Sequence, residues 1–317
     1  MLEQIHLIQD YFPWFFPAIL FIFGSIVGSF LNVCIYRIPL GQSIVHPRSF
    51  CPVSGQSIVW YDNIPIISFL LLRGKGRISQ QPISSRYLFV EVLTAVIFLI
   101  CWLIFSPGKA ICGMIFCSIL VCATFIDLEH MIIPDSFSIG GMMAGVTLAF
   151  AIPSLHDFHD SIFLIGSLKS GITAIVGAFI GSALVLWIGL LAEIALRREA
   201  MGFGDVKFIG AIGSFCGWQG SIFAVFGGAV IGTIGFFIYK IITVIFGIKK
   251  KRFTPEKKTK DILIKTERIP GNKNEELFGK EVPFGPMLAL AALIYFTYYD
   301  KHVDAYFSEL SLLIFGG

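Results

Sequence analysis

Two aspartates lie where apolar segments of this sequence meet polar ones, and they are the residues best placed to do chemistry. Asp205 follows Gly202 and Gly204 in the pattern Gly-x-Gly-Asp, and Asp127 ends an apolar run. An ionised carboxylate in or beside a bilayer costs several kcal/mol unless it is paired or hydrated, so a membrane protein that keeps one there usually has a use for it. Both aspartates are therefore candidate functional residues.

The chemistry available to such a pair is peptide hydrolysis. Two carboxylates brought face to face cannot both ionise comfortably, so they share a proton. One then acts as a base on water while the other polarises a carbonyl, as in an aspartic protease. A structural interpretation stays open beside this one: Asp127 and Asp205 are interfacial acids that cap helices or meet Lys207 and Arg197.

The composition indicates the class of protein that positions these residues. Of 317 residues, 56% are hydrophobic and 14% are charged, and the mean hydropathy is +0.80. Such a chain is a multi-span membrane protein. The net charge is +3, and the lysines and arginines are clustered on particular loops, so no nucleic-acid partner is implied. Six of the seven cysteines fall in apolar runs, which favours reduced packing residues over a disulfide framework.

The apolar runs predict an all-α polytopic membrane protein with about eight transmembrane helices. The division between the sixth and seventh runs, near Trp218, is the least distinct boundary. The first run has no basic start or cleavage site before it and reads as a retained span. The runs are 14–36, 87–105, 111–126, 137–152, 168–196, 208–218, 220–247 and 284–299.

Charge predicts three regions and their orientation. Residues 1–36 hold the first span, with the N-terminus outside, and residues 37–86 form a small basic cytoplasmic domain. Residues 87–317 form the remaining membrane core, with a basic cytoplasmic loop at 248–282. Residues 153–167 have no lysine or arginine and face outward, so both aspartates come near the cytoplasmic face.

Several separated segments of the chain resemble the type IV prepilin peptidases, the Gly-x-Gly-Asp prepilin leader peptidase/N-methyltransferases of pilus assembly and type II secretion. The resemblance covers nearly the whole chain. It rests on the stretches Gly28 to Val33, Asp62 to Pro65, Ile83 to Tyr87, Glu91 to Thr94, Asp127 with Pro134-Asp135, Gly202 to Lys207, and Phe284 to Pro286.

The resemblance implies an intramembrane aspartyl endopeptidase of the bacterial inner membrane. Its substrates would be prepilins and pseudopilins, whose basic leader is removed after a glycine at the cytoplasmic face. Asp127 and Asp205 would be the catalytic acids. Membrane lipid and pilus or type II secretion assembly proteins are the other expected partners.

Further residues are expected to support the site. Lys207 steadies Asp205, contacts phospholipid or only extends to the interface. Glu129 binds the basic leader or is an ordinary surface acid. Gly285 and Pro286 start the last helix and line the cleft. Pro134, which closes the turn after Asp127, and the following Asp135 complete the set.

The loop at 37–86 departs from the family pattern. Many members carry two Cys-x-x-Cys pairs that hold zinc, whereas this loop has Cys51 alone, with His46 nearby. Tetrahedral zinc needs about four donors, so no metal is expected. S-adenosylmethionine-dependent methylation of the new N-terminal phenylalanine is implied by the resemblance alone, with Gly74 and Lys75 as candidate residues.

Two other functions remain open. Paired intramembrane acids also serve as proton carriers in transporters, although we find no inverted repeat, and both acids lie toward one face instead of the midplane. A non-catalytic scaffold for pilus or secretion proteins is the third hypothesis. Replacing Asp127 or Asp205 by asparagine separates them: a protease loses cleavage, a transporter loses proton-coupled flux, and a scaffold loses neither.

Overall fold

The computed structural model describes residues 11–46, 58–77, 80–197, 201–245 and 283–299. Within these ranges the chain is helical, and the only β feature is an isolated bridge between Lys75 and Pro82. The predicted all-α membrane fold is confirmed. Five helices are long and apolar enough to cross a membrane: α2 (Phe15–Arg37), α4 (Ser85–Ile104), α5 (Pro107–His130), α7 (Phe163–Leu196) and α8 (Phe203–Ile245).

Two shorter helices pack with them in the described part of the chain, α6 (Asp135–Ala151) and α9 (Gly285–Ile294), the latter continued by a π-helical turn, η5 (Tyr295–Tyr299). Each predicted apolar run overlaps a described helix, but the runs 208–218 and 220–247 both fall in α8. The count of eight spans and their orientation stay predictions. α8 is interrupted at Gly217, whose φ of 70° and ψ of −177° are not helical. Glycine adopts this conformation without strain, and the break directly precedes Trp218, where the sequence left the boundary indistinct.

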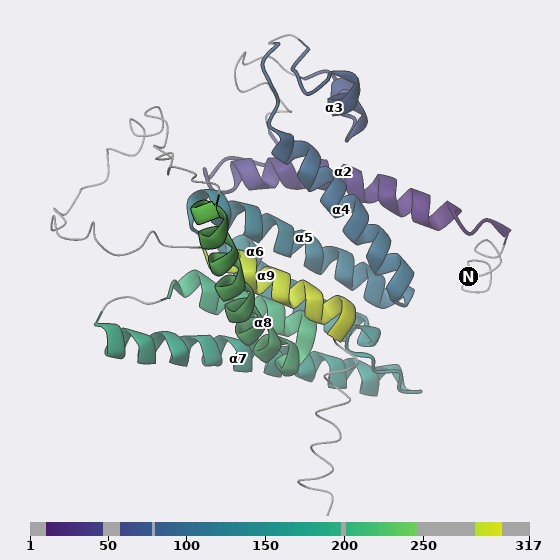
Figure 1. Cartoon of the computed structure of the whole chain (residues 1–317). Coiled ribbons are helices and arrows are strands. Elements are labelled where there is room, and N and C mark those ends of the chain that lie inside the picture. The colour runs from purple at the N-terminus through teal and green to yellow at the C-terminus, as the bar shows by residue number, and fades with distance from the viewer. Residues whose placement is uncertain (1–10, 47–57, 78–79, 198–200, 246–282, 300–317) are drawn as a thin grey trace, which may run out of the picture.

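The helices pack side by side in the order α2 and α4, α5, α9, α8 and α7 (Figure 1). Glycines allow close backbone contact, as is usual between membrane helices. A Cβ on Gly28 of α2 would lie 2.7 Å from the Cα of Glu91, and one on Gly24 would lie 2.8 Å from the Cα of Ala95. Only glycine fits these two contacts with α4.

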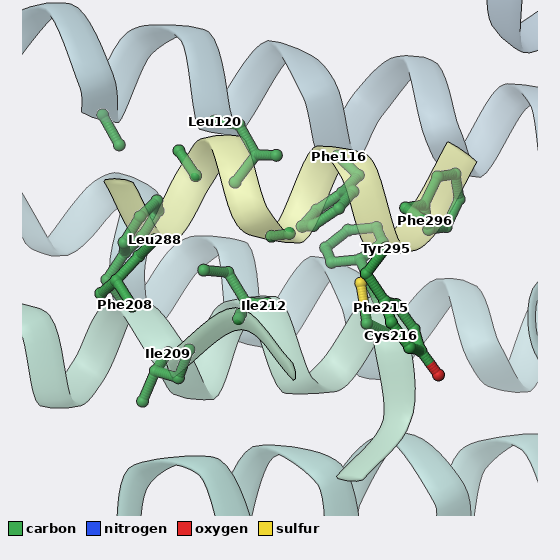
Figure 2. Packing of buried hydrophobic residues seen from close by; sticks show 14 of the residues in the cluster. Phe116, Leu120, Phe208, Ile209, Ile212, Phe215, Cys216, Leu288, Tyr295 and Phe296 are labelled. Carbon is green, nitrogen blue, oxygen red and sulfur yellow. The ribbon is translucent and has the colours of Figure 1, made fainter. Parts of the chain in front are cut away.

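An aromatic and aliphatic core joins α5, α8 and α9 (Figure 2). The Phe116 ring stacks on Phe215 with centroids 4.7 Å apart and lies 5.3 Å from the Phe296 ring. A second buried cluster joins α2, α4 and α5. Six cysteines are free and buried, which confirms their predicted packing role: Cys34, Cys101, Cys112, Cys117, Cys122 and Cys216.

Candidate active site

Asp127 lies in the last turn of α5 and is only 6% exposed. The helix ends just beyond it because Met131 takes the left-handed conformation, with φ 57°, and donates its N–H to the Asp127 carbonyl at 2.9 Å. The Asp127 side chain reaches across to α9, where Oδ2 accepts a hydrogen bond from the backbone N–H of Gly285 at 3.1 Å. The first turn of α9 therefore belongs to the aspartate site.

Asp205 lies in the first turn of α8. Its backbone N–H donates to the Gly202 carbonyl at 3.1 Å, which forms the turn leading into the helix. A Cβ on Gly202 would lie 3.8 Å from Asp205 Oδ2, and one on Gly204 would lie 3.6 Å from Ile133 Cβ. Both distances are ordinary van der Waals contacts, so these two glycines lie next to the Asp205 carboxylate and to the loop after α5 without a close contact that requires glycine.

The two carboxylates come together where the end of α5 meets the beginnings of α8 and α9. Asp127 Oδ2 and Ile133 Cδ1 both border the position of a Cβ on Gly285, and Ile133 Cβ borders the position of Gly204, the residue before Asp205. Ile133, in the loop between α5 and α6, contacts both Gly204 and Gly285 positions. The arrangement has the composition required for the acid–base pair that the sequence predicted.

The core directly beneath the site holds these three helix ends in place. Leu120 lies two turns before Asp127 on α5, while Phe208 and Leu288 lie one turn after Asp205 and Gly285. All three side chains are buried in the cluster that Figure 2 displays. Because residues at this spacing share a helix face, packing them together also places the acids on the same side.

Two ion pairs brace the segments that carry the aspartates. The Lys207 ammonium donates to Asp135 Oδ1 at 2.7 Å, joining α8 to the start of α6. Residues two apart on a helix do not face each other, which explains why Lys207 meets Asp135 and not Asp205. Arg86, at the start of α4, pairs with Glu129 in the last turn of α5. Glu129 therefore already has a basic partner within the chain.

Two prolines start the neighbouring helices. Pro134 caps the N-terminus of α6, and its carbonyl accepts a hydrogen bond from the Ser138 hydroxyl at 3.3 Å. Pro286 lies in the first turn of α9, the position expected from the sequence, where its missing N–H leaves no donor unsatisfied. Both helices therefore begin beside the aspartates.

Gly74 and Lys75 lie apart from this site, in the segment around α3 (Ile67–Leu71) that Figure 1 shows beyond α2 and α4, on the side away from α9. Gly74 has a φ of 69°, and a Cβ there would lie 3.2 Å from the Phe69 ring. Its carbonyl accepts the Ile83 N–H at 2.7 Å. Their role in methyl transfer stays a prediction.

Glu91 is a buried acid to which sequence reasoning gave no role. Its Oε2 accepts the backbone N–H of Ile66 at 2.8 Å, and it is also hydrogen-bonded to the Ser29 hydroxyl. Ile66 has a φ of 62°, an unusual value for a β-branched residue. The signals in the sequence were an acid near the start of the apolar run at 87–105 and its place in the stretch Glu91 to Thr94, which carries part of the family resemblance. Glu91 therefore anchors the loop to α2 and α4.

Among the described residues, no group of three or more His, Cys, Asp and Glu side chains lies close enough to hold a metal ion. Cys51 and its neighbours, on which the expectation about zinc rests, lie outside the described residues. The same is true of the basic loop at 248–282.

The structure is a helical membrane bundle with two aspartates at neighbouring helix ends, an arrangement that suits an acid–base pair. Comparison with known proteins gives the family. Residues 22–105 match the bacterial peptidase A24 N-terminal domain, and residues 114–237 match the type IV leader peptidase family. The chain belongs to the type IV leader peptidase family.

Named relatives agree with this assignment. A prepilin leader peptidase/N-methyltransferase from Myxococcus xanthus is 38% identical over 232 residues, covering 72% of this chain and 65% of the relative. One from Klebsiella pneumoniae is 34% identical over 229 residues, covering 69% and 94%. A type 4 prepilin-like proteins leader peptide-processing enzyme from Escherichia coli is 36% identical over 225 residues, covering 65% and 79%. No solved structure matches the chain.

Proposed function

We propose that this chain is an intramembrane aspartyl endopeptidase that removes the basic leader of type IV prepilins and pseudopilins after a glycine. Asp127 and Asp205 are the catalytic acids. The observation that carries the proposal is the convergence of the two carboxylates, with Asp127 held by the Gly285 N–H at 3.1 Å. The names of the relatives, which refer to prepilin leaders, support the choice of substrate.

The pair works as a unit that carries one proton. The charged carboxylate takes a proton from water as the water oxygen bonds to the scissile carbonyl carbon, and the protonated carboxyl donates a hydrogen bond to the carbonyl oxygen. The tetrahedral intermediate then loses its C–N bond, and the leaving amine takes up a proton from the pair. The hydrogen bond from Gly285 keeps the Asp127 carboxyl group in one orientation throughout.

We place the two acids at the cytoplasmic face of the bacterial inner membrane. The loop at 37–86 is strongly basic, and the positive-inside rule assigns such a loop to the cytoplasm. The contact between Arg86, where this loop ends, and Glu129, one half-turn beyond Asp127, supports the same side for the aspartates. Lys207 remains a candidate for contact with lipid headgroups, and Glu129 for contact with the basic leader. An interaction of the chain with pilus or secretion assembly proteins is also part of the proposal.

Methyl transfer to the new N-terminal phenylalanine, with S-adenosylmethionine as donor, is part of the proposal because the relatives bear the name N-methyltransferase. The described part of the loop does not by itself fit this donor. Within residues 58–77 and 80–83 the one acidic side chain is Asp62, which forms an ion pair with Arg77 at 2.7 Å. Gly74 lies against the Phe69 ring.

The test is the mass of a prepilin-type substrate, with a basic leader before Gly-Phe, after incubation with the detergent-purified full chain and S-adenosylmethionine. We expect loss of the leader plus addition of one methyl group. Asp127→Asn and Asp205→Asn each abolish cleavage. Asp160→Asn is the matched control, because Asp160 pairs with Lys169 outside the aspartate site.

Loss of the leader without methylation would remove the transferase part of the proposal. An unchanged mass with folded protein would contradict the peptidase, and a proton-coupled flux that depends on Asp127 would then identify a transporter. Cleavage that persists in both asparagine variants would exclude this pair as the catalytic acids.

A further inference from the structure

Ile133, in the loop between α5 and α6, lies next to Gly204, the residue before Asp205, and to Gly285, whose N–H binds Asp127. The loop starts at Met131, where α5 ends, and finishes at Pro134, which caps α6. Ile133 is half-buried and packs against the main core, whereas its neighbour Ile132 is 49% exposed. The two isoleucines therefore form a natural comparison of the same residue type in two environments.

The contacts of Ile133 place its side chain beside the catalytic carboxylate. A Cβ added to Gly285 would lie 3.1 Å from Ile133 Cδ1 and 2.6 Å from Asp127 Oδ2. The methyl tip of Ile133 and the carboxylate oxygen thus border the same small volume. On its other side, a Cβ added to Gly204 would lie 3.6 Å from Ile133 Cβ.

The position of this side chain is fixed by its neighbours. A residue before proline is restricted to extended conformations, so Pro134 limits the backbone of Ile133. Asp135, the next residue, is joined to Lys207 at 2.7 Å, which ties the end of the loop to α8. Ile133 is therefore held in a fixed position next to Gly204 and Gly285.

We propose that Ile133 is a specificity-determining residue that admits only glycine on the N-terminal side of the scissile bond. This inference rests on the proposed peptidase function. The attacked carbonyl must lie between the two carboxylates, and the Cα of the same substrate residue comes with it. A side chain on that Cα would enter the volume that the Ile133 tip and the Gly285 backbone already border, so bulk is rejected by a clash.

The test compares two prepilin-type peptides that differ only in glycine or alanine before the cleavage point. Full-length wild type, Ile133→Val, Ile133→Ala and Ile132→Ala are assayed for kcat/KM on both. Ile133→Val is the sharpest variant, because it removes only Cδ1, the atom nearest to Gly285. Ile132→Ala is the control from the same loop.

We expect the alanine-to-glycine ratio of kcat/KM to rise about tenfold in Ile133→Val and further in Ile133→Ala, since one methyl group in a tight site is worth roughly 10- to 200-fold. The ratio in Ile132→Ala stays at the wild-type value. Melting temperatures of all variants show whether a low rate reflects unfolding, and Ile133→Val decides the matter if Ile133→Ala does not fold.

A wild type that cleaves the glycine peptide while folded Ile133→Val keeps the wild-type ratio would overturn the inference and leave the peptidase intact. The same holds if Ile132→Ala raises the ratio as much as Ile133→Val does. A wild type that cleaves neither peptide fails at the proposed function itself, so the two failures are distinguishable.

Discussion

The backbone N–H of Gly285 donates to Oδ2 of Asp127 at 3.1 Å, although 158 positions separate the two residues in the sequence. This contact makes the first turn of the last described helix a part of the aspartate site. It also explains why the residue before Pro286 is glycine: a Cβ there would lie 2.6 Å from the same carboxylate oxygen.

Gly285→Ala is expected to lower peptidase activity by roughly 100-fold, because the carboxylate must move away from the added methyl group and misplacement by about 1 Å has effects of this size. The melting temperature changes little, since the carboxylate is the end of a movable side chain. The measurement is kcat/KM on a glycine-containing prepilin peptide, with a thermal melt in the same detergent.

The matched control is Gly235→Ala, at a position on α8 where an added Cβ meets nothing within 4 Å. This variant is expected to retain full activity and to gain up to about 1 kcal/mol of stability from better helix propensity. Equal losses of activity at Gly285 and Gly235 would mean that the hydrogen bond to Asp127 has no special importance.

The ion pair between Lys207 and Asp135 is expected to matter for activity more than for stability. Its side chains are 27% and 63% exposed, so its stabilising contribution lies below about 1 kcal/mol. Lys207→Met and Asp135→Asn should each lower kcat/KM roughly tenfold by loosening α8 from the loop, and the double variant should be no worse than either, as coupled residues require.

The pair of Lys169 and Asp160, also 2.7 Å apart, supplies the comparison. The cycle of Lys169→Met and Asp160→Asn is expected to leave kcat/KM unchanged. Additive losses in the Lys207 cycle, or equal losses in both cycles, would show that the contact with Asp135 does not position the site.

Glu91 is expected to hold the loop through its bond to Ile66. Without an acceptor for this N–H, the positive φ of 62° at Ile66, which costs about 1–3 kcal/mol, loses its support. Glu91→Ala should raise hydrogen exchange of residues 61–72 by tenfold or more, because a hydrogen bond to a charged group contributes about 1.5–3 kcal/mol.

Thr94→Ala tests the specificity of that effect. Thr94 is buried on the same helix, and its hydroxyl bonds only one turn back, to the Val90 carbonyl at 2.8 Å. Exchange in residues 61–72 should remain at the wild-type rate. A protected loop in Glu91→Ala would refute the anchoring role.

Acid should destabilise the protein through His156, which follows α6 and lies outside the membrane-spanning helices. Burial lowers the pKa of His156 to about 4, and the positive charge of Lys109 contributes to the decrease. The negative charge of Asp157 raises the pKa and offsets part of the decrease. The unfolded chain therefore binds the proton first as the pH falls from 6.5 toward 4, and stability drops by up to about 1.4 kcal/mol per pH unit.

In the wild type, His156 Nδ1 lies 2.9 Å from the Ser170 hydroxyl. His156→Asn keeps a hydrogen-bonding partner for this hydroxyl but cannot take up a proton, so the melting temperature should decline less steeply over that pH range. His159→Asn, at an exposed position nearby, should retain the wild-type slope. Identical slopes in wild type and His156→Asn would assign the acid sensitivity to other groups.

The features that depend on local residue types were predictable from the sequence. Apolar runs indicated the helices, Pro286 indicated the start of the last described one, and the acids Asp127 and Asp205 were recognisable against apolar surroundings. The break at Gly217 was expected only as an indistinct boundary near Trp218. These signals act within a few residues of the chain, which is the range over which a single sequence is informative.

The contacts that assemble the site were not predictable in the same way. The bond from Gly285 to Asp127 and the pair of Lys207 with Asp135 join residues 158 and 72 positions apart, and they exist only because the core packs three helices together. Ile133 carries no signal at all, since an isoleucine beside a proline is common. Its significance comes from the two glycine positions it contacts.

The location of the two acids at helix ends bears on how a membrane-anchored substrate is reached. Asp127 is in the last turn of α5 and Asp205 in the first turn of α8, so neither lies deep within a span. Under the proposed function, a polypeptide whose own apolar segment stays in lipid meets both carboxylates at its entry into the membrane. Its backbone hydrogen bonds need not be broken in hydrocarbon, where each exposed group costs several kcal/mol. Hydrolysis then requires no unwinding of the substrate within the bilayer.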